Sequence, residues 1–226
     1  MEDTGKEGAM RAKYYGHAAF LITSNQGTRI ITDPYTPGAF DAMSYGGISD
    51  KADVVTVSHD HDDHNYSEGL PGNPEVLQTP GKRSVYGIEF NGIATFHDTS
   101  SGRERGENII FSFIVDGITI CHLGDLGHVL SGNEVEAIGA VDLLMIPVGG
   151  FYTIDSKVAS EVAGQLNPLI IIPMHFKTGK CEFPITPVEE FTKGKARVKV
   201  VDSSEISLGR GELSKETEII VLHHAL

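Results

Sequence analysis

The sequence predicts an α/β protein in which two β-sheets pack together and the helices lie outside them. Two observations predict this class. The first half of the chain is a series of short apolar and β-branched runs separated by glycine, proline and asparagine, as is typical of strands and turns. The second half alternates helical spacing with continuous apolar runs, as is typical of strands buried on both faces.

The elements follow one another without a repeat or a linker. In order, the strands expected in the first half cover 13–24, 28–35, 52–60, 75–79, 84–90, 92–98, 108–117 and 118–125. Helices are expected at 133–140 and 156–167, each followed by a buried strand, at 141–150 and 168–176. A third helix is expected over 186–196, with Thr186 as its N-cap and Pro187 at its first position. Strands at 198–201 and 217–224 close the chain.

The size and composition favour one domain. The chain has 226 residues, of which 40% are hydrophobic, so it can bury a sizeable core. We expect a single domain over 11–226 and a loose tail over 1–10, with Met10 as an alternative start. No apolar run reaches the roughly 18 residues that a membrane helix needs, so we expect no membrane insertion.

Charge and cysteine content restrict the expected partners and cellular compartment of the protein. The formal net charge is −13, which disfavours nucleic acid as a partner, although bound cations could make a site locally positive. Cys121 and Cys181 are far apart and form no CxxC motif. There is no signal peptide pattern, and we therefore expect a cytoplasmic protein without a disulfide scaffold.

The stretch SHDHDDH at 58–64 is the most informative in the chain. Its carboxylates would repel one another without a cation. His59 and His61 are two residues apart, so in an extended segment both point to one side. Asp63 and His64 come after the chain turns and can face a neighbouring position. Imidazole and carboxylate groups suit zinc and similar divalent ions, and the alternative is a solvated acidic turn.

Other apolar runs also end in residues that can bind metal. His97, Asp125 and His175 each follow an expected strand. A single histidine after a strand is usually a hydrogen-bonded core or surface residue. Three such strand ends beside a His/Asp cluster are better explained by one shared site.

The order of these segments resembles the metallo-β-lactamase superfamily. The matching segments are TDP with Asp33, HDHDDH at 59–64, FHD with His97, LGD with Asp125 and MHF with His175. GHAAF and IPVGG are similar to the compact branch that includes ascorbate-6-phosphate lactonase-like hydrolases. The resemblance implies an αββα four-layer sandwich of two mixed sheets, with a dinuclear metal site at one edge.

The resemblance also implies a division of roles. His59, His61 and His97 would hold one metal ion, and Asp63, His64 and His175 the other. Asp125 would bridge the two ions, and Asp33 would support the loop without binding metal. Zinc is the default ion, and manganese, iron and nickel fit the same ligands.

These roles imply a dinuclear metal-dependent hydrolase. A water between two divalent ions becomes hydroxide near neutral pH and attacks a carbonyl or phosphoryl centre. We expect a small ester, lactone or phosphoester as the substrate. The sequence is compatible with a homo-oligomer. The chain contains neither a GxSxG nor a P-loop motif.

Four further residues are weaker candidates. His17, in GHAAF, could bind substrate or donate a proton to a leaving group, or be a structural histidine. His128 could reach the site from its position after Asp125, or cap the local turn. Tyr152 could border the pocket, and Lys177 could pair with an anionic substrate group or lie on the surface.

Two alternative functions remain open from sequence. One is a phosphodiesterase of the phospholipid-cleaving type, although no basic amphipathic helix supports it. The other is a non-hydrolytic metal or redox module. Relatives of that kind generally have carboxylates at ligand positions that are histidine here, together with an attached flavodoxin-like domain.

Overall fold

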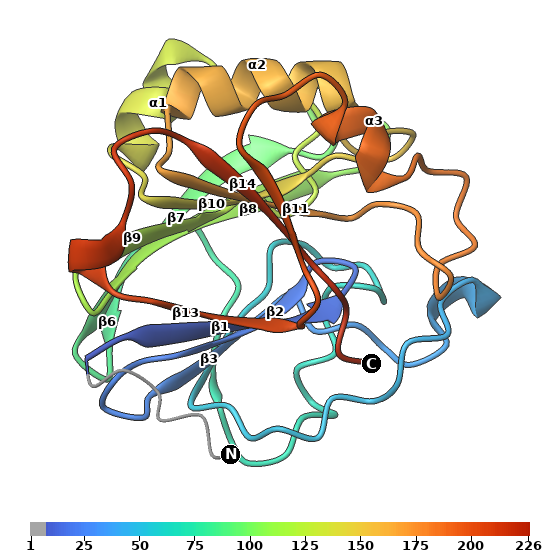
Figure 1. Ribbon diagram of the computed structural model, residues 1–226. Helices are drawn as coiled ribbons and strands as arrows, with labels where there is room; N and C mark the ends of the chain where they lie inside the picture. Colours follow the sequence, from blue (N-terminus) through green and yellow to red (C-terminus); the bar gives the residue numbers. More distant parts are fainter. Residues whose placement is uncertain (1–7) are drawn as a thin grey trace.

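The computed structural model describes residues 8–226 and consists of two β-sheets packed face to face (Figure 1). The two-sheet sandwich expected from the sequence is confirmed. The first sheet has the order β13-β1-β2-β3-β4-β5. Its strands are β1 (Met10–Gly16), β2 (Ala19–Thr23), β3 (Arg29–Thr32), β4 (Val54–Thr56), β5 (Glu75–Leu77) and β13 (Glu205–Leu208).

The second sheet has eight strands in the order β12-β14-β11-β10-β9-β8-β7-β6. They are β6 (Gly81–Val85), β7 (Ile88–Phe96), β8 (Glu107–Val115), β9 (Ile118–His122), β10 (Leu143–Pro147), β11 (Ile170–Met174), β12 (Val198–Val201) and β14 (Glu218–Leu222). Both sheets are mixed, since β3, β4 and β5 run parallel in one, and β9, β10, β11, β14 and β12 in the other.

The α-helices of the described region all lie over the eight-stranded sheet (Figure 1). They are α1 (Gly132–Ile138), α2 (Ser156–Leu166) and α3 (Val188–Thr192). In α2 the Asp155 side chain accepts hydrogen bonds from two backbone N–H groups at the N-terminus. The helix ends at Asn167, which has a left-handed conformation, followed by Pro168.

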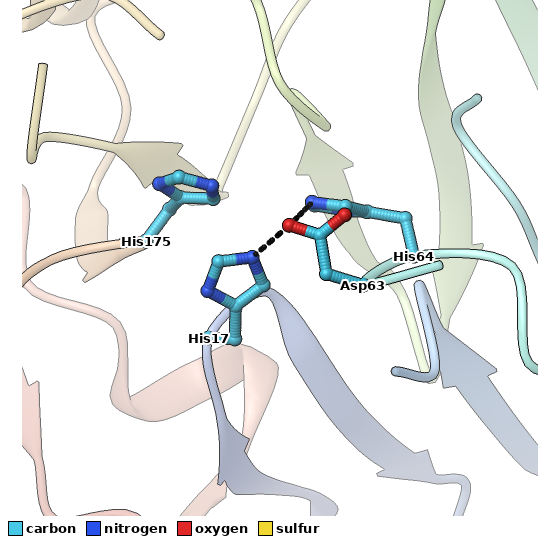
Figure 2. Close-up of side chains that lie close together, drawn as sticks. All are labelled: His17, Asp63, His64 and His175. Carbon is cyan, nitrogen blue, oxygen red and sulfur yellow. Dashed lines mark hydrogen bonds and ion pairs between the residues drawn. The ribbon is translucent and has the colours of Figure 1, made fainter. Parts of the chain in front are cut away.

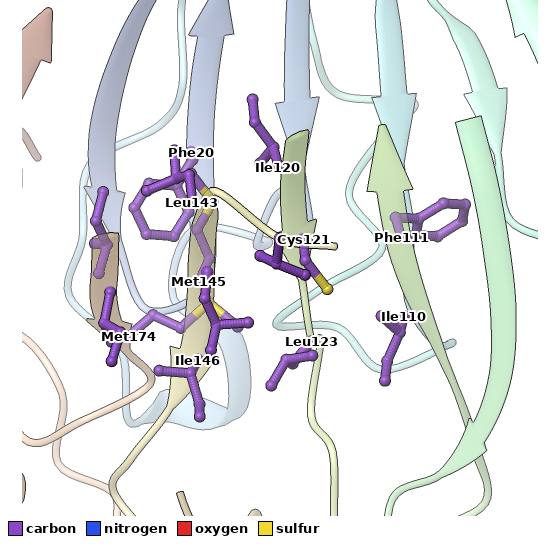
Figure 3. Packing of buried hydrophobic residues seen from close by; sticks show 14 of the residues in the cluster. Phe20, Ile110, Phe111, Ile120, Cys121, Leu123, Leu143, Met145, Ile146 and Met174 are labelled. Carbon is purple, nitrogen blue, oxygen red and sulfur yellow. The ribbon is translucent and has the colours of Figure 1, made fainter. Parts of the chain in front are cut away.

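The core between the sheets follows from the period of two along each strand. In β2, Phe20 and Ile22 belong to the main hydrophobic cluster, whereas Ala19 and Leu21 belong to a second cluster on the other face. The central strands β10 and β11 of the eight-stranded sheet are buried on both faces, each with five buried residues in succession. Figure 3 shows part of the main cluster.

The outer face of the six-stranded sheet is covered by loops. The segment between β3 and β4 supplies Tyr35, Met43, Tyr45 and Ile48 to the second cluster. Its one short helix is the 3₁₀ turn η1 (Ala39–Asp41), and a second 3₁₀ turn, η2 (Arg210–Glu212), precedes β14. The helical layer is therefore developed on one side of the sandwich.

Some element boundaries differ from those expected. The run 13–24 is divided between β1 and β2 by a tight turn, where Gly16 has φ 127° and His17 has φ 56°. The run 84–90 crosses the β6–β7 turn, because Tyr86 and Gly87 both have positive φ. Strand β13 was not expected.

The third helix is shorter than the expected 186–196. Thr186 is not its N-cap, because the Thr186 hydroxyl donates to the Gly149 carbonyl, and Pro187 takes the N-cap position. The helix ends before Gly194, which has φ 72°.

The described chain starts close to the expected domain boundary. Residues 1–7 of the expected tail lie outside the described residues. Met10, the last residue of that tail, is fully buried in β1 and pairs with Leu208. Within residues 8–226, none of the helices combines the length and apolar character that crossing a membrane requires.

Candidate metal centre

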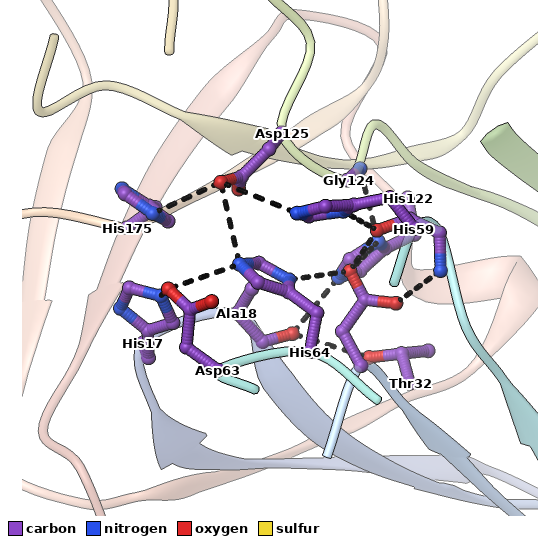
Figure 4. A network of polar contacts seen from close by, with 12 residues as sticks. His17, Ala18, Thr32, His59, Asp63, His64, His122, Gly124, Asp125 and His175 are labelled. Atoms are coloured by element: carbon purple, nitrogen blue, oxygen red, sulfur yellow. Dashed lines mark hydrogen bonds and ion pairs between the residues drawn. The ribbon is translucent and has the colours of Figure 1, made fainter. Parts of the chain in front are cut away.

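The candidate ligands lie where several strands end at one edge of the sandwich (Figure 4). Asp33 directly follows β3, and the 59–64 loop follows β4, which runs parallel to β3. In the other sheet His97 follows β7, Asp125 follows β9 and His175 follows β11. Strands β7 and β9 both run antiparallel to β8, so their carboxyl ends meet at the same edge.

A first group of possible metal ligands consists of His59, His61 and His97, with one ligand atom of each within 4.8 Å of the others. His59 and His97 are buried and His61 is half-buried. The His59 ring lies 4.6 Å from the His61 ring and 4.8 Å from the His97 ring, between ring centroids. These three residues are the set expected for one ion.

A second group consists of His17, Asp63, His64 and His175, all buried (Figure 2). Three of these residues are the set expected for the other ion, and His17 is an addition. The Nε2 atom of His17 lies 3.0 Å from Oδ2 of Asp63, and its ring centroid is 4.1 Å from that of His175. The tight β1–β2 turn therefore brings a fourth potential ligand to this group.

Backbone strain is concentrated here. His17, Asp33 and His175 have φ values of 56°, 38° and 50°, in the left-handed region that residues with a Cβ rarely adopt. Such conformations cost of order 1–3 kcal/mol each and cluster at functional sites. The surrounding sheets hold these side chains in positions that the local backbone does not favour.

Asp125 lies between the two groups. Its Oδ2 is 3.2 Å from Nε2 of His97, 3.2 Å from Nε2 of His175, 3.3 Å from Nε2 of His64 and 4.0 Å from Nε2 of His59. One carboxylate oxygen thus faces histidines of both groups. Its other oxygen, Oδ1, is buried without a hydrogen-bond partner among the described residues.

Asp33 controls the tautomer of one histidine in each group. Its Oδ2 lies 2.9 Å from Nδ1 of His64, and because a carboxylate only accepts, His64 donates from Nδ1. The Ser58 hydroxyl donates to the same oxygen at 2.6 Å, and its own oxygen faces Nδ1 of His59 at 2.9 Å. His59 therefore also carries its proton on Nδ1.

This proton arrangement leaves the Nε2 atoms as lone-pair donors. Nε2 of His59 and Nε2 of His64 are buried without a hydrogen-bond partner in the described region. In neutral His64 this lone pair would face an oxygen of Asp125 at 3.3 Å, and two lone pairs so placed repel. A proton on Nε2 of His64 or a cation removes this repulsion, but a cation would also satisfy Nε2 of His59, whose lack of a partner costs roughly 1–3 kcal/mol. The residues therefore fit a metal ion.

Burial and neighbouring charges shift the pKa values of these histidines in different directions. Burial, followed by the charge of His175, lowers the pKa of His17 to about 4, and burial with the charge of His64 lowers that of His59 to about 3. For His64, burial works downward, but Asp125, Asp63 and Asp33 together raise its pKa. The histidines in turn hold the pKa of Asp125 well below its usual value, against the effect of burial.

The backbone at Asp125 is fixed by a buried amide that sequence reasoning missed. Asn108 accepts the Asp125 N–H at 2.9 Å through Oδ1 and donates through Nδ2 to the Leu123 carbonyl at 3.0 Å. Gly124 has φ 56°, and a Cβ added there would lie 2.4 Å from Oδ1 of Asn108. Only glycine fits this turn.

A cavity of about 580 Å³ opens onto both groups. Tyr152 lines it beside His61, Asp63, His97, Asp125 and His175. The other lining residues were not expected from sequence. They are Phe40, Ala42, Glu104, Arg105, Glu182, Phe183 and Pro184. The loops that supply them carry no metal ligand, so the ligand pattern did not mark them.

Two predicted site residues lie elsewhere. His128 accepts the Phe96 N–H at Nε2 and donates from Nδ1 to the Val129 carbonyl, so one nitrogen bonds to the end of β7 and the other within its own turn. Lys177 donates to the Phe183 carbonyl at 2.9 Å and lines a separate cavity. Neither side chain lines the metal-facing cavity.

Comparison with known proteins agrees with this geometry. The profile described as a Beta-lactamase superfamily domain matches residues 11–175. The chain belongs to the metallo-β-lactamase superfamily. A crystal structure from Thermotoga maritima, a proposed Zn-dependent hydrolase of this superfamily, is 40% identical, with a TM-score of 0.78 over 94% of this chain and 98% of that one.

Curated relatives extend the likeness to the carboxyl-terminal part. A UPF0173 metal-dependent hydrolase from Pyrococcus abyssi is 29% identical over 87% of this chain and 98% of its own length. As a metallo-β-lactamase superfamily member with this ligand set, the chain is a metal-dependent hydrolase in its general class. None of these names specifies an ascorbate-6-phosphate lactonase, so that finer likeness stays a prediction.

Proposed function

We propose that the chain uses two divalent cations to hydrolyse a small ester, lactone or phosphoester. The observation that carries the proposal is the position of Asp125. Its Oδ2 lies 3.2 Å from a histidine of the first group and 3.2–3.3 Å from two histidines of the second. A carboxylate so placed suits two neighbouring cations better than one.

The two groups divide the ligands. His59, His61 and His97 would hold one ion, and Asp63, His64 and His175 the other, with Asp125 shared. When bound, two such ions would lower the pKa of a coordinated water and polarise the bond that is cleaved. Zinc fits this nitrogen and oxygen set, and manganese, iron and nickel are compatible with it.

His17 acts on Asp63 rather than on the substrate. It is fully buried and does not line the cavity, so it does not reach a leaving group there. With neutral His17, the contact at 3.0 Å requires Nε2–H to donate to Oδ2 of Asp63. This contact orients the carboxylate.

The metal content tests the dinuclear site. Purified protein saturated with zinc should contain close to two ions per chain by elemental analysis after gel filtration. Asp125→Ala should lose occupancy at both sites, because the shared ligand is removed. Asp62→Ala is the matched control, since Asp62 is an exposed residue of the same loop and belongs to neither group.

A substrate screen tests the reaction. Lactones, carboxylic esters, thioesters and phosphodiesters should be assayed with defined metals, and at least one class should be turned over by the wild type and by Asp62→Ala, but not by Asp125→Ala. A wild-type content of one ion, or turnover that survives in Asp125→Ala, contradicts the dinuclear proposal.

A further inference from the structure

Arg105 is a cation at the edge of the metal-facing cavity. It lines this cavity of about 580 Å³ and also a neighbouring cavity of about 630 Å³. His61 is the other residue that lines both. Arg105 and the candidate metal-binding residue His61 therefore lie where the two cavities meet.

The guanidinium of Arg105 retains unused donors. Within residues 8–226, Arg11, Arg29, Arg197 and Arg210 each pair with a carboxylate. Of the three described arginines that do not, Arg83, Arg103 and Arg105, only Arg105 lines either cavity. Its side chain donates from Nη2 to the Phe151 carbonyl at 3.2 Å. A guanidinium has five N–H donors arranged to match a carboxylate or a phosphate, so several remain for a ligand.

The position of Arg105 is organised in advance. The Asp98 carboxylate accepts hydrogen bonds from the backbone N–H groups of Ser100, Gly102, Glu104 and Arg105, at 2.7–2.9 Å. These bonds close the 98–106 loop on a residue adjacent to His97. The guanidinium carbon also lies 5.9 Å from the centroid of the Tyr152 ring. Ordering the arginine on ligand binding therefore costs little.

An aromatic wall extends from Arg105 along the cavity. The rings of Phe40, Phe183, Tyr152 and Phe151 form a continuous series, with successive centroids 6.0, 5.4 and 4.8 Å apart. The first three line the cavity, and Phe151 continues the series beyond its lining. Phe40 is 56% exposed and Phe151 is 63% exposed, and both have positive φ. Large apolar side chains held exposed in a strained backbone favour a binding role over a packing role.

Besides the candidate metal ligands Asp63 and Asp125, two carboxylates line the cavity and oppose an anionic ligand, Glu104 and Glu182. Oε1 of Glu104 accepts a hydrogen bond from the Ser100 hydroxyl at 2.6 Å, so that carboxylate is turned toward its own loop. Glu182 is exposed and directly precedes Phe183 in the sequence. No ion pair joins Arg105 to either carboxylate in the described region, so its guanidinium is available to a ligand anion.

We propose that the cavity selects esters that carry an anionic group, a carboxylate or a phosphate, remote from the bond that is cleaved. The anion pairs with Arg105, and the apolar part of the substrate packs on the wall formed by Phe40, Phe183 and Tyr152. The assignment rests on the proposed function, because it presumes that the cleaved bond lies at Asp125.

Binding measurements test this subsite without turnover. Hexanoate, adipate and 5-phosphonopentanoate have similar length, and each carries one carboxylate that the metal centre can hold. Calorimetric titration of zinc-loaded wild type should give a Kd at least about tenfold lower for adipate or 5-phosphonopentanoate than for hexanoate, the range expected of a charge-assisted hydrogen-bonded pair. Whichever of adipate and 5-phosphonopentanoate has the lower Kd shows whether the subsite prefers a carboxylate or a phosphate-like group.

The variants isolate the arginine. Arg105→Gln should bring the Kd ratio between the dianion and hexanoate close to one, and Arg105→Lys should restore part of it. Arg103→Gln is the matched control, because Arg103 lies on the same loop and lines neither cavity. Phe40→Ala should weaken all three ligands by a similar factor. A ratio near one in wild type, or a ratio that survives in Arg105→Gln, overturns the proposal.

A parallel assay separates this proposal from the proposed function. The 4-nitrophenyl esters of the same three acids should show the same order in KM. Equal KM values for the three esters with normal turnover would contradict the anion subsite and leave the hydrolase intact. Absence of turnover of every ester, with the binding preference retained, would contradict an esterase function and support the subsite.

Discussion

Asp33 is linked to a histidine of each candidate metal group, and it also forms a possible ligand group of its own with His59 and His64. It accepts a hydrogen bond from Nδ1 of His64 directly and orders His59 through the Ser58 hydroxyl. Nε2 of each histidine then faces Asp125, and it offers a lone pair to a metal ion when the ring is neutral. Partners of this kind fix the orientation and basicity of metal-bound histidines, and their loss typically costs 10–100-fold in metal affinity.

The two branches of this network can be tested separately. Ser58→Ala removes the acceptor for His59 alone, so affinity should fall about 10–100-fold at one of the two ions. Asp33→Asn disturbs His59 and His64 and should weaken both ions. Competition titration of metal-free protein with a chromophoric chelator measures the two affinities.

Asp53→Asn provides the control, because Asp53 pairs with Arg29 and belongs to neither metal group. Equal weakening of both ions by Ser58→Ala would contradict the separate branches, as would unchanged affinities in Asp33→Asn.

At the scale of elements, the 98–106 loop depends on a single side chain. Asp98 is buried, and four of the loop's backbone N–H groups bond to it. A loop of this length has few other means to satisfy its backbone, so its conformation follows from that carboxylate. The loop then places Arg105 against the Phe151 carbonyl of another loop.

Asp98→Ala should release this loop. Limited digestion with trypsin should then cut after Arg103 or Arg105 much faster than in wild type, and the free energy of unfolding should fall by about 1–3 kcal/mol. Asp155→Ala is the control, because it removes the N-cap of α2 and should cost about 1 kcal/mol without exposing the loop. An unchanged cleavage rate in Asp98→Ala would show that other contacts order the loop.

At the scale of the whole molecule, buried histidines couple metal binding to folding. Burial is the largest cause of lowered pKa values among these histidines. It lowers the pKa of His17 to about 4 and that of His59 to about 3, and it also lowers the pKa values of His61 and His122. The pKa of His64 is raised instead. In the unfolded chain all five titrate near 6.5, so most of these residues bind a proton more readily when unfolded.

The metal-free protein should therefore lose stability in acid. As the pH falls from about 6.5 toward 4, the unfolded chain takes up protons that folded His17 and His59 do not, so the free energy of unfolding decreases. Each such group contributes up to about 1.4 kcal/mol per pH unit. The raised pKa of His64 acts in the opposite direction, and the lowered pKa values of Asp33, Asp63 and Asp125 matter only below about pH 4.

Urea unfolding of metal-free protein at pH 7.5, 6 and 5 measures this dependence. Zinc should raise the unfolding free energy at pH 7.5 and do so less at pH 5, because protons compete for the ligands. Stability that stays level or rises toward pH 5 would contradict the direction assigned to the buried histidines.

Much of the candidate site could be predicted because its chemistry is local in sequence. His59, His61, Asp63 and His64 occupy one short loop, and His97 and His175 directly follow apolar runs. Element ends were harder to predict. The third helix stops before Gly194, and Thr186 bonds to Gly149 across the fold rather than capping that helix. Such contacts are not visible in a local pattern.

Residues that act through distant partners escaped sequence reasoning. His17 meets Asp63 across 46 positions of sequence, and Asn108 meets Asp125 across 17. Lys177 follows His175 in the sequence, and Arg105 follows His97. Nothing in the residues that flank these two cations indicates which of them borders the cavity. The choice depends on where the Phe183 and Phe151 carbonyls lie.

The sequence by itself determined the two-sheet class, the superfamily and most members of the two candidate metal groups, because strand periodicity and ligand chemistry are properties of short segments. Only the tertiary structure decided that His17 joins the second group, that Asp33 sets the tautomers of His59 and His64, and that Arg105 borders the cavity. These features depend on distances between atoms, and the register and parallel course of the strands bring those atoms to one edge.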